Sequence, residues 1–183
     1  MARKKAPSDP LPLALQDLGK VDQLWDVEEG VDLELDSGLS TLQEAAQELQ
    51  SWLGTAPAVV VPIRWFGQDR SGGRYGLWIL HAEAALEAQP IVFFGSEGEH
   101  GVIARDLADF LVLLSRGISV LDVLEKTKKF DVRPMPAIRV VAQRHAPQAM
   151  ARTTEVIAAE ARALNKSFLQ VLRGPQKRKR SSG

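Results

Sequence analysis

The chain has 183 residues, enough for one domain with a substantial core, and its 45% hydrophobic and 25% charged residues exclude overall disorder. The absence of cysteine excludes disulfides, thiolate metal sites and cysteine nucleophiles, and it fits a reducing compartment. No apolar run is long enough for a membrane helix, and the basic start leads into no long apolar segment, so we expect a cytoplasmic protein without a secretory signal or a membrane partner.

The formal net charge is zero, but the acidic and basic residues are separated along the sequence. Positions 21–36 contain no Lys or Arg and carry the acids Asp22, Asp26, Glu28, Glu29, Asp32, Glu34 and Asp36. The sequence after Glu160 contains no acid and carries the bases Arg162, Lys166, Arg173, Lys177, Arg178, Lys179 and Arg180. This separation predicts an acidic surface and a basic tail.

The first predicted helix follows a flexible lead over residues 1–9. Asp9 is a suitable N-cap with Pro10 at the first helical position, and apolar residues recur at helical spacing to about Trp25. Residues 26–39 alternate acids with aliphatic residues, which is typical of a short exposed strand or a loop.

A second helix is predicted over residues 40–53. Ser40 and Gln43 match a capping box, an apolar stripe follows them, and Gly54 supplies the stop. The β-branched run 58–65 then predicts a strand, which Pro62 restricts to a sheet edge or a bulge. A turn over 66–74 and a returning strand over 75–81 complete a hairpin.

The centre of the sequence is the stretch 90–117. The apolar run 91–94 predicts a strand buried on both faces, 95–101 form a glycine-rich acidic bend, and 102–104 continue the sheet. Asp106 is the predicted cap of an amphipathic helix that ends at Gly117, and Ser119 opens a short helix to about Lys128.

The C-terminal part is predicted to be mainly helical. Prolines interrupt the pattern over 130–136, and a last helix is expected from about Pro147 to Arg173, with a narrow apolar seam. The predicted organisation is a flexible lead at 1–9, an α+β domain at 10–130, a helical extension at 131–173 and a disordered basic tail at 174–183. For the domain we expect a small, mostly antiparallel sheet with helices packed on one side.

Two blocks together carry a family resemblance. The first is Phe66-Gly-Gln-Asp-Arg-Ser-Gly-Gly-Arg-Tyr-Gly-Leu-Trp, and the second is Pro90-Ile-Val-Phe-Phe-Gly-Ser-Glu-Gly-Glu with the Asp106–Leu114 helix. They resemble the SUKH superfamily, which includes a yeast regulator of cell-wall synthesis and bacterial toxin-immunity proteins. The match is strongest over residues 58–117. It lacks the family's early LP-x-x-Y/F segment and does not cover the region after Phe130. For a bacterial member, the resemblance implies an immunity protein that occludes a toxin domain.

Candidate binding residues are acidic. The bend supplies Glu97, Glu99 and the neighbouring His100, the hairpin turn supplies Asp69, and a second patch consists of Asp26, Glu28 and Glu29. Each has a simpler interpretation as a solvated turn, a hairpin turn or a surface residue. The three histidines have no metal-ligand spacing, so we expect no metal. The sequence has neither a nucleophile elbow nor a phosphate loop, so we expect no catalysis and no cofactor. The basic tail has no interleaved aromatic residues, so we expect no nucleic-acid partner.

The sequence therefore favours a protein-binding module. An acidic patch would complement the basic clefts of toxins that act on nucleic acid. Two alternatives remain: a regulatory or scaffold protein that forms homo-oligomers through its C-terminal helix, and a hydrolase or phosphate-binding enzyme that uses Glu97, Glu99 and His100.

Overall fold

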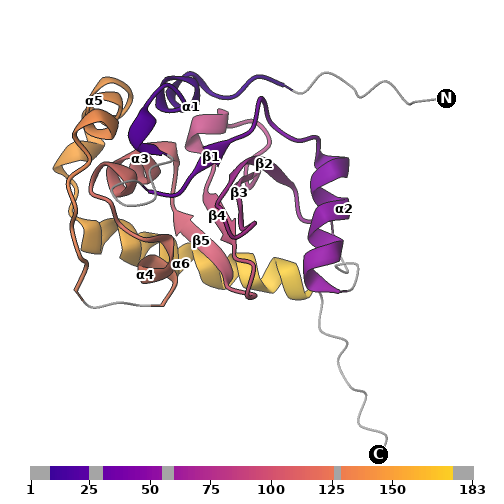
Figure 1. Cartoon of the computed structure of the whole chain (residues 1–183). Coiled ribbons are helices and arrows are strands. Elements are labelled where there is room, and N and C mark those ends of the chain that lie inside the picture. The colour runs from indigo at the N-terminus through magenta and orange to yellow at the C-terminus, as the bar shows by residue number, and fades with distance from the viewer. Residues whose placement is uncertain (1–8, 25–30, 55–59, 126–128, 175–183) are drawn as a thin grey trace, which may run out of the picture.

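The computed structural model describes residues 9–24, 31–54, 60–125 and 129–174, and these residues form an α+β fold around a five-stranded antiparallel sheet (Figure 1). The strands lie side by side in chain order: β1 (Glu34–Leu35), β2 (Ile63–Gln68), β3 (Arg74–Trp78), β4 (Ile91–Phe94) and β5 (His100–Ala104). Each strand pairs antiparallel with the next. The predicted α+β class and the antiparallel sheet are confirmed.

The helices of the described residues precede, interrupt and follow the sheet. The α-helices are α1 (Leu13–Leu18), α2 (Leu42–Leu53), α3 (Leu107–Ser115), α4 (Val120–Leu124), α5 (Pro136–His145) and α6 (Thr154–Arg173). Short 3-10 turns are η1 (Asp22–Leu24), η2 (Leu86–Ala88) and η3 (Ala149–Ala151). None of the described helices combines the length and apolar character needed to cross a bilayer.

Helices cover both faces of the sheet, whereas the sequence predicted one covered face. Side chains alternate between the faces of a strand. On one face, Tyr75 of β3 and Phe93 of β4 lie together, and Phe110 of α3 packs on Tyr75. On the other face, Trp78 and Phe94 contact Phe168 of α6. Figure 1 shows α1, α3 and α5 gathered at one side of the sheet and α2 at the opposite side.

The core is built from the elements that the sequence marks most strongly. All four residues of β4 are buried, as predicted for a strand between two neighbours. Helix α3 is buried almost all round, because it lies between the sheet and α5. Trp65 and Trp78 are buried as predicted, Trp52 packs partly against the core, and Trp25 lies outside the described residues.

The C-terminal helices pack on the same core as the sheet. Helix α5 packs on α3 and α1, and α6 packs along β5 with Ile157, Ala161 and Phe168 fully buried. The predicted single helix from Pro147 is wrong at its start, because Thr153 caps α6 by accepting a hydrogen bond from the backbone N–H of Val156. Helix α5 was not predicted. Its Pro136 occupies the first turn, where the missing N–H costs no helical bond.

The N-terminal helix is shorter than predicted. Helix α1 begins after Pro12 and ends at Gly19. Asp9 does not cap it. Instead, the carbonyl of Asp9 accepts from the backbone N–H of Leu39, and its carboxylate accepts from Nη1 of Arg64 at 2.8 Å.

Side chains cap the N-termini of α2, α3 and α4. The capping box of α2 lies one residue later than predicted, with Thr41 accepting from the N–H of Glu44 and the Glu44 carboxylate accepting from the N–H of Thr41. The predicted cap of α3 is confirmed, since Asp106 accepts from the N–H of Asp109 at 2.8 Å. Ser119 caps α4 by accepting from the N–H of Leu121.

Helix α6 lies against one outer strand, β5, and the other outer strand, β1, has only two residues. Asn165 of α6 accepts a hydrogen bond from the backbone N–H of Val102 on β5. Beyond the two-residue strand β1, the following segment continues along β2, where Ser40 bonds both backbone groups of Trp65. The prediction for Pro62 is corrected, because β2 begins after it and bulges between Trp65 and Gly67 instead.

Candidate functional site

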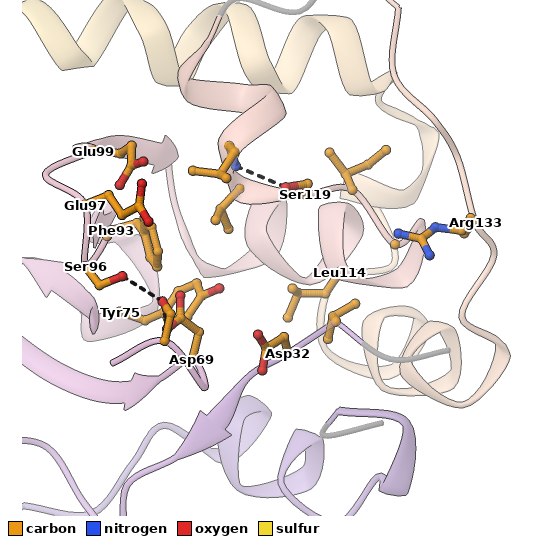
Figure 2. A pocket seen from close by; sticks show the side chains of 17 residues that line it. Asp32, Asp69, Tyr75, Phe93, Ser96, Glu97, Glu99, Leu114, Ser119 and Arg133 are labelled. Atoms are coloured by element: carbon orange, nitrogen blue, oxygen red, sulfur yellow. Dashed lines mark hydrogen bonds between the residues drawn. The ribbon is translucent and has the colours of Figure 1, made fainter. Parts of the chain in front are cut away.

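A groove of about 590 Å³ lies where the tips of two β-hairpins face the loop between α3 and α4 (Figure 2). The β2–β3 turn and the β4–β5 bend form one wall, and residues 117–121 form the other. Its polar lining side chains are Asp32, Asp69, Ser71, Tyr75, Ser96, Glu97, Glu99, Ser119 and Arg133, and its apolar ones are Val31, Phe93, Leu114, Ile118, Val120 and Leu121. The structure thus brings together Asp69, Glu97 and Glu99.

Asp69 shapes the first hairpin tip. Its Oδ1 accepts hydrogen bonds from the backbone N–H of Gly73 and from the hydroxyl of Ser71, both at 2.7 Å. Its own N–H donates to the carbonyl of Gly73, and Gly72 takes a φ of 90°, which favours glycine. The simpler interpretation of a hairpin turn is therefore confirmed, and the same carboxylate borders the groove.

The acidic bend is a tight turn between β4 and β5. The backbone N–H of Gly95 donates to the carbonyl of Glu99 at 2.6 Å, and Gly98 takes a φ of 99°. The hydroxyl of Ser96 donates to Ser71 at 3.1 Å, which joins the two hairpin tips. Glu97 is exposed and Glu99 is half-buried at the open side of the groove.

The other predicted site residues are not part of the groove. His100 stacks on Phe94 with ring centroids 5.5 Å apart, and its Nδ1 lies 2.8 Å from the carbonyl oxygen of Gly98. It therefore belongs to the face of the sheet away from Phe93. Asp26, Glu28 and Glu29 lie outside the described residues.

Tyr75 is a groove residue that the sequence analysis missed. Its ring is buried at 3% exposure against Phe93 and Phe110, with centroid distances of 4.9 Å and 6.0 Å. Burial raises the pKa of Tyr75, and the charges of Asp69 and Asp32 raise it further, so the hydroxyl stays protonated at neutral pH. Among the described residues, this hydroxyl has no hydrogen-bond partner.

Asp32 and Arg133 border the groove from distant parts of the chain. Asp32 has a φ of 52°, a left-handed conformation that aspartate tolerates, and it lies 3.6 Å from Nε of Arg70. Arg133 is exposed on the opposite side of the groove from Glu97 and Glu99 (Figure 2). The sequence placed Asp32 only within the acid-rich segment 21–36, and it gave no signal that Arg133 belongs to a site.

A second hollow, of about 420 Å³, lies beside the start of α6 and contains Arg116, Arg139 and Arg152. Two of these guanidinium groups already serve the fold. Arg116 donates to Thr154 and to the carbonyls of Met150 and Arg152, and Arg152 pairs with Asp109. The first groove is therefore the stronger candidate for a site.

The chemistry of the groove favours binding. Within the described part of the chain, no three His, Asp or Glu side chains gather as metal ligands. An exposed glutamate such as Glu97 lacks the burial that tunes a carboxyl group for general acid–base catalysis. What the groove does present is an acidic wall over an apolar floor. Comparison of the chain with family models, curated proteins and solved structures found no match.

Proposed function

We propose that this chain is a non-catalytic protein-binding module, and that it acts as an immunity protein that neutralises a cognate bacterial toxin domain in the cytoplasm. The observation that carries the proposal is the unneutralised acidic wall of the groove. Among the described residues, Asp69, Glu97 and Glu99 form no ion pair, although carboxylates elsewhere on the fold are paired with arginines. An acidic surface of this kind complements a basic cleft and accelerates association with it.

The apolar floor supports the same proposal. Phe93, Leu114 and Ile118 line the groove beneath the charged wall. Protein interfaces combine an apolar centre with a polar rim, and the groove presents both. The resemblance to the SUKH superfamily supports a toxin domain as the class of partner, and membership of that superfamily is part of the proposal.

Oligomerisation through the last helix has less support. A scaffold function would need the apolar seam of α6 to be available to a second copy. Ile157, Ala161 and Phe168 of that seam are instead buried against the chain's own core. We therefore do not extend the proposal to a homo-oligomer.

The test is affinity capture of partners with the full-length chain from the cells that make it. The matched baits are the wild type, the double variant Glu97→Gln/Glu99→Gln, and the control Glu83→Gln/Glu87→Gln, whose two residues are exposed outside the groove. We expect one partner that the wild type and the control retain and the groove variant loses.

The captured domain is then expressed in a laboratory bacterium with and without this chain. Growth arrest that the wild type relieves supports the proposal, and a partner that is harmless, or that the groove variant retains, contradicts it.

A further inference from the structure

The charges of the groove are distributed unevenly. Asp69, Glu97 and Glu99 stand on one wall, and Arg133 stands on the other side (Figure 2). Some carboxylates elsewhere on the fold are neutralised internally: Arg74 on β3 pairs with Asp36 and with Glu48 on α2. The acidic wall therefore has a place for one positive charge, which the described residues do not supply.

Tyr75 provides an independent indication of a ligand at the same place. Its side chain is almost wholly buried, yet it lines the groove and its hydroxyl has no partner among the described residues. The hydroxyl oxygen is not among the buried atoms of this side chain, so it is open to a hydrogen-bonding group that enters the groove. Asp69 and Asp32 act electrostatically on this hydroxyl, which places it at the acidic wall. A protonated phenol there accepts a hydrogen bond from a cationic N–H and donates one to a carboxylate.

The floor beside Tyr75 suits a long aliphatic stem. Phe93, Leu114 and Ile118 are almost completely buried and line the groove next to the acidic wall. Lys and Arg side chains lay their methylene stems on apolar surface while the charged head reaches polar groups. Arginine matches better than lysine, because its planar head has five donors for acceptors in several directions and stacks on aromatic rings.

We propose that the groove binds one arginine side chain of a protein partner, with the guanidinium group between the Tyr75 hydroxyl and the carboxylates of Glu97, Glu99 and Asp69. The stem lies on Phe93, Leu114 and Ile118. Arg133 repels a second cation at the far side, so the groove selects a single basic residue over a run of them. This inference rests on the proposed function, because it names the group that the partner presents.

The test is an NMR titration of the full-length ¹⁵N-labelled chain with two capped pentapeptides. One is Ala-Ala-Arg-Ala-Ala, and the other carries citrulline, the neutral isostere of arginine, at the central position. We expect the amide signals of Gly95, Gly98 and Ile118 to shift in a saturable manner with the arginine peptide. The affinity for the citrulline peptide, measured from the same signals, should be at least tenfold weaker. Shifts that do not saturate, or that are equal for both peptides, overturn the proposal.

Variants locate the binding. Tyr75→Phe keeps the packed ring and removes the hydroxyl, and we expect the affinity to fall about three- to tenfold. Glu97→Gln/Glu99→Gln is expected to reduce it at least tenfold, and Glu83→Gln/Glu87→Gln to leave it within about twofold. Unchanged spectra outside the groove show that each variant is folded. An affinity that is insensitive to both groove variants places the arginine elsewhere and overturns the proposal.

The two proposals fail separately. Arginine-peptide binding with the expected variant pattern supports the arginine site even if no toxin is neutralised, in which case the immunity function fails. A toxin partner that depends on Glu97 and Glu99, without any binding of the arginine peptide, leaves the immunity function standing and overturns the arginine site.

Discussion

Phe168 on α6 packs edge to face against Trp78 on β3, with ring centroids 5.0 Å apart and planes at 60°. Both side chains are buried, and Phe94 of β4 contacts the same phenyl ring. Aromatic contacts therefore pack the last helix of the described chain, α6, against the inner strands β3 and β4.

This packing predicts a large effect of Phe168→Ala. Removing a buried phenyl ring leaves a cavity and costs about 3–5 kcal/mol. The free energy of unfolding from urea titration measures the loss, and Ser167→Ala, at an exposed position on the same helix, serves as the control with an expected change within about 0.5 kcal/mol. A loss below about 1 kcal/mol would mean that α6 contributes little to the folded core.

The ion pair between Asp109 and Arg152 predicts strong coupling between α3 and the start of α6. Nη1 of Arg152 donates to both carboxylate oxygens of Asp109 at 2.7 Å, and Asp109 is completely buried. Asp109→Ala should cost about 3–5 kcal/mol, because it leaves Arg152 with an incomplete partner set, and the double variant with Arg152→Ala should cost less than the sum of the two single losses. Chemical denaturation of the four proteins measures this coupling. Additive losses would show that the pair acts as two independent residues.

Asp17 predicts a pH dependence of stability. Hydrogen bonds from Lys20, and from His145 and Arg144 at the end of α5, hold the pKa of Asp17 well below its ordinary value. A carboxyl group whose pKa is depressed by folding stabilises the protein above its unfolded-state pKa, about 4, and that stabilisation is lost as the pH falls toward the folded-state pKa. The wild type should therefore exceed Asp17→Asn in its urea midpoint at neutral pH, and the difference should shrink below about pH 4. Lys20→Ala removes one of the three hydrogen bonds that lower this pKa and should reduce the difference only in part. A difference that is constant with pH would contradict the prediction.

The hydroxyl groups of Ser40 and Thr41 predict two separable effects. Thr41→Ala removes the capping box of α2 and should cost about 0.5–2 kcal/mol, with faster amide hydrogen exchange in the first turn of that helix. Ser40→Ala instead removes the acceptor of the Trp65 N–H, so faster exchange is expected in β2. Hydrogen exchange by NMR distinguishes the two, and Ser51→Ala near the end of α2 is the control. Fraying of α2 in Ser40→Ala alone would restore the cap position predicted from the sequence.

Local signals in the sequence predicted the elements whose stability is local. The cap Asp106 with the apolar run behind it is enough to define α3, and the run 91–94 is too short and too apolar to be anything but an inner strand. Helix α5 was missed because Pro134 and Pro136 indicate a break. Only the packing of Ile138, Val141 and Ala142 on the core shows that Pro136 begins a helix.

The acidic residues of the groove could also be predicted from local signals in the sequence. Asp69 and the two glutamates follow from two hairpin turns, and antiparallel pairing of β3 with β4 brings those turns to the same end of the sheet. Tyr75 sits in a run of buried residues, so its pattern indicates core only. Asp32 and Arg133 reach the groove through tertiary contacts between distant segments, and no periodicity or spacing records such contacts.

The occupied flanks of the sheet limit how the molecule can associate. With Asn165 and α6 along β5, and residues 34–40 along β2, the described chain leaves no long ladder of backbone groups for a foreign strand to continue. Edge-to-edge addition of strands, the step that extends an amyloid sheet, is therefore disfavoured for the folded protein. We therefore expect this protein to bind other molecules through its side chains, and not by pairing a foreign strand with its backbone.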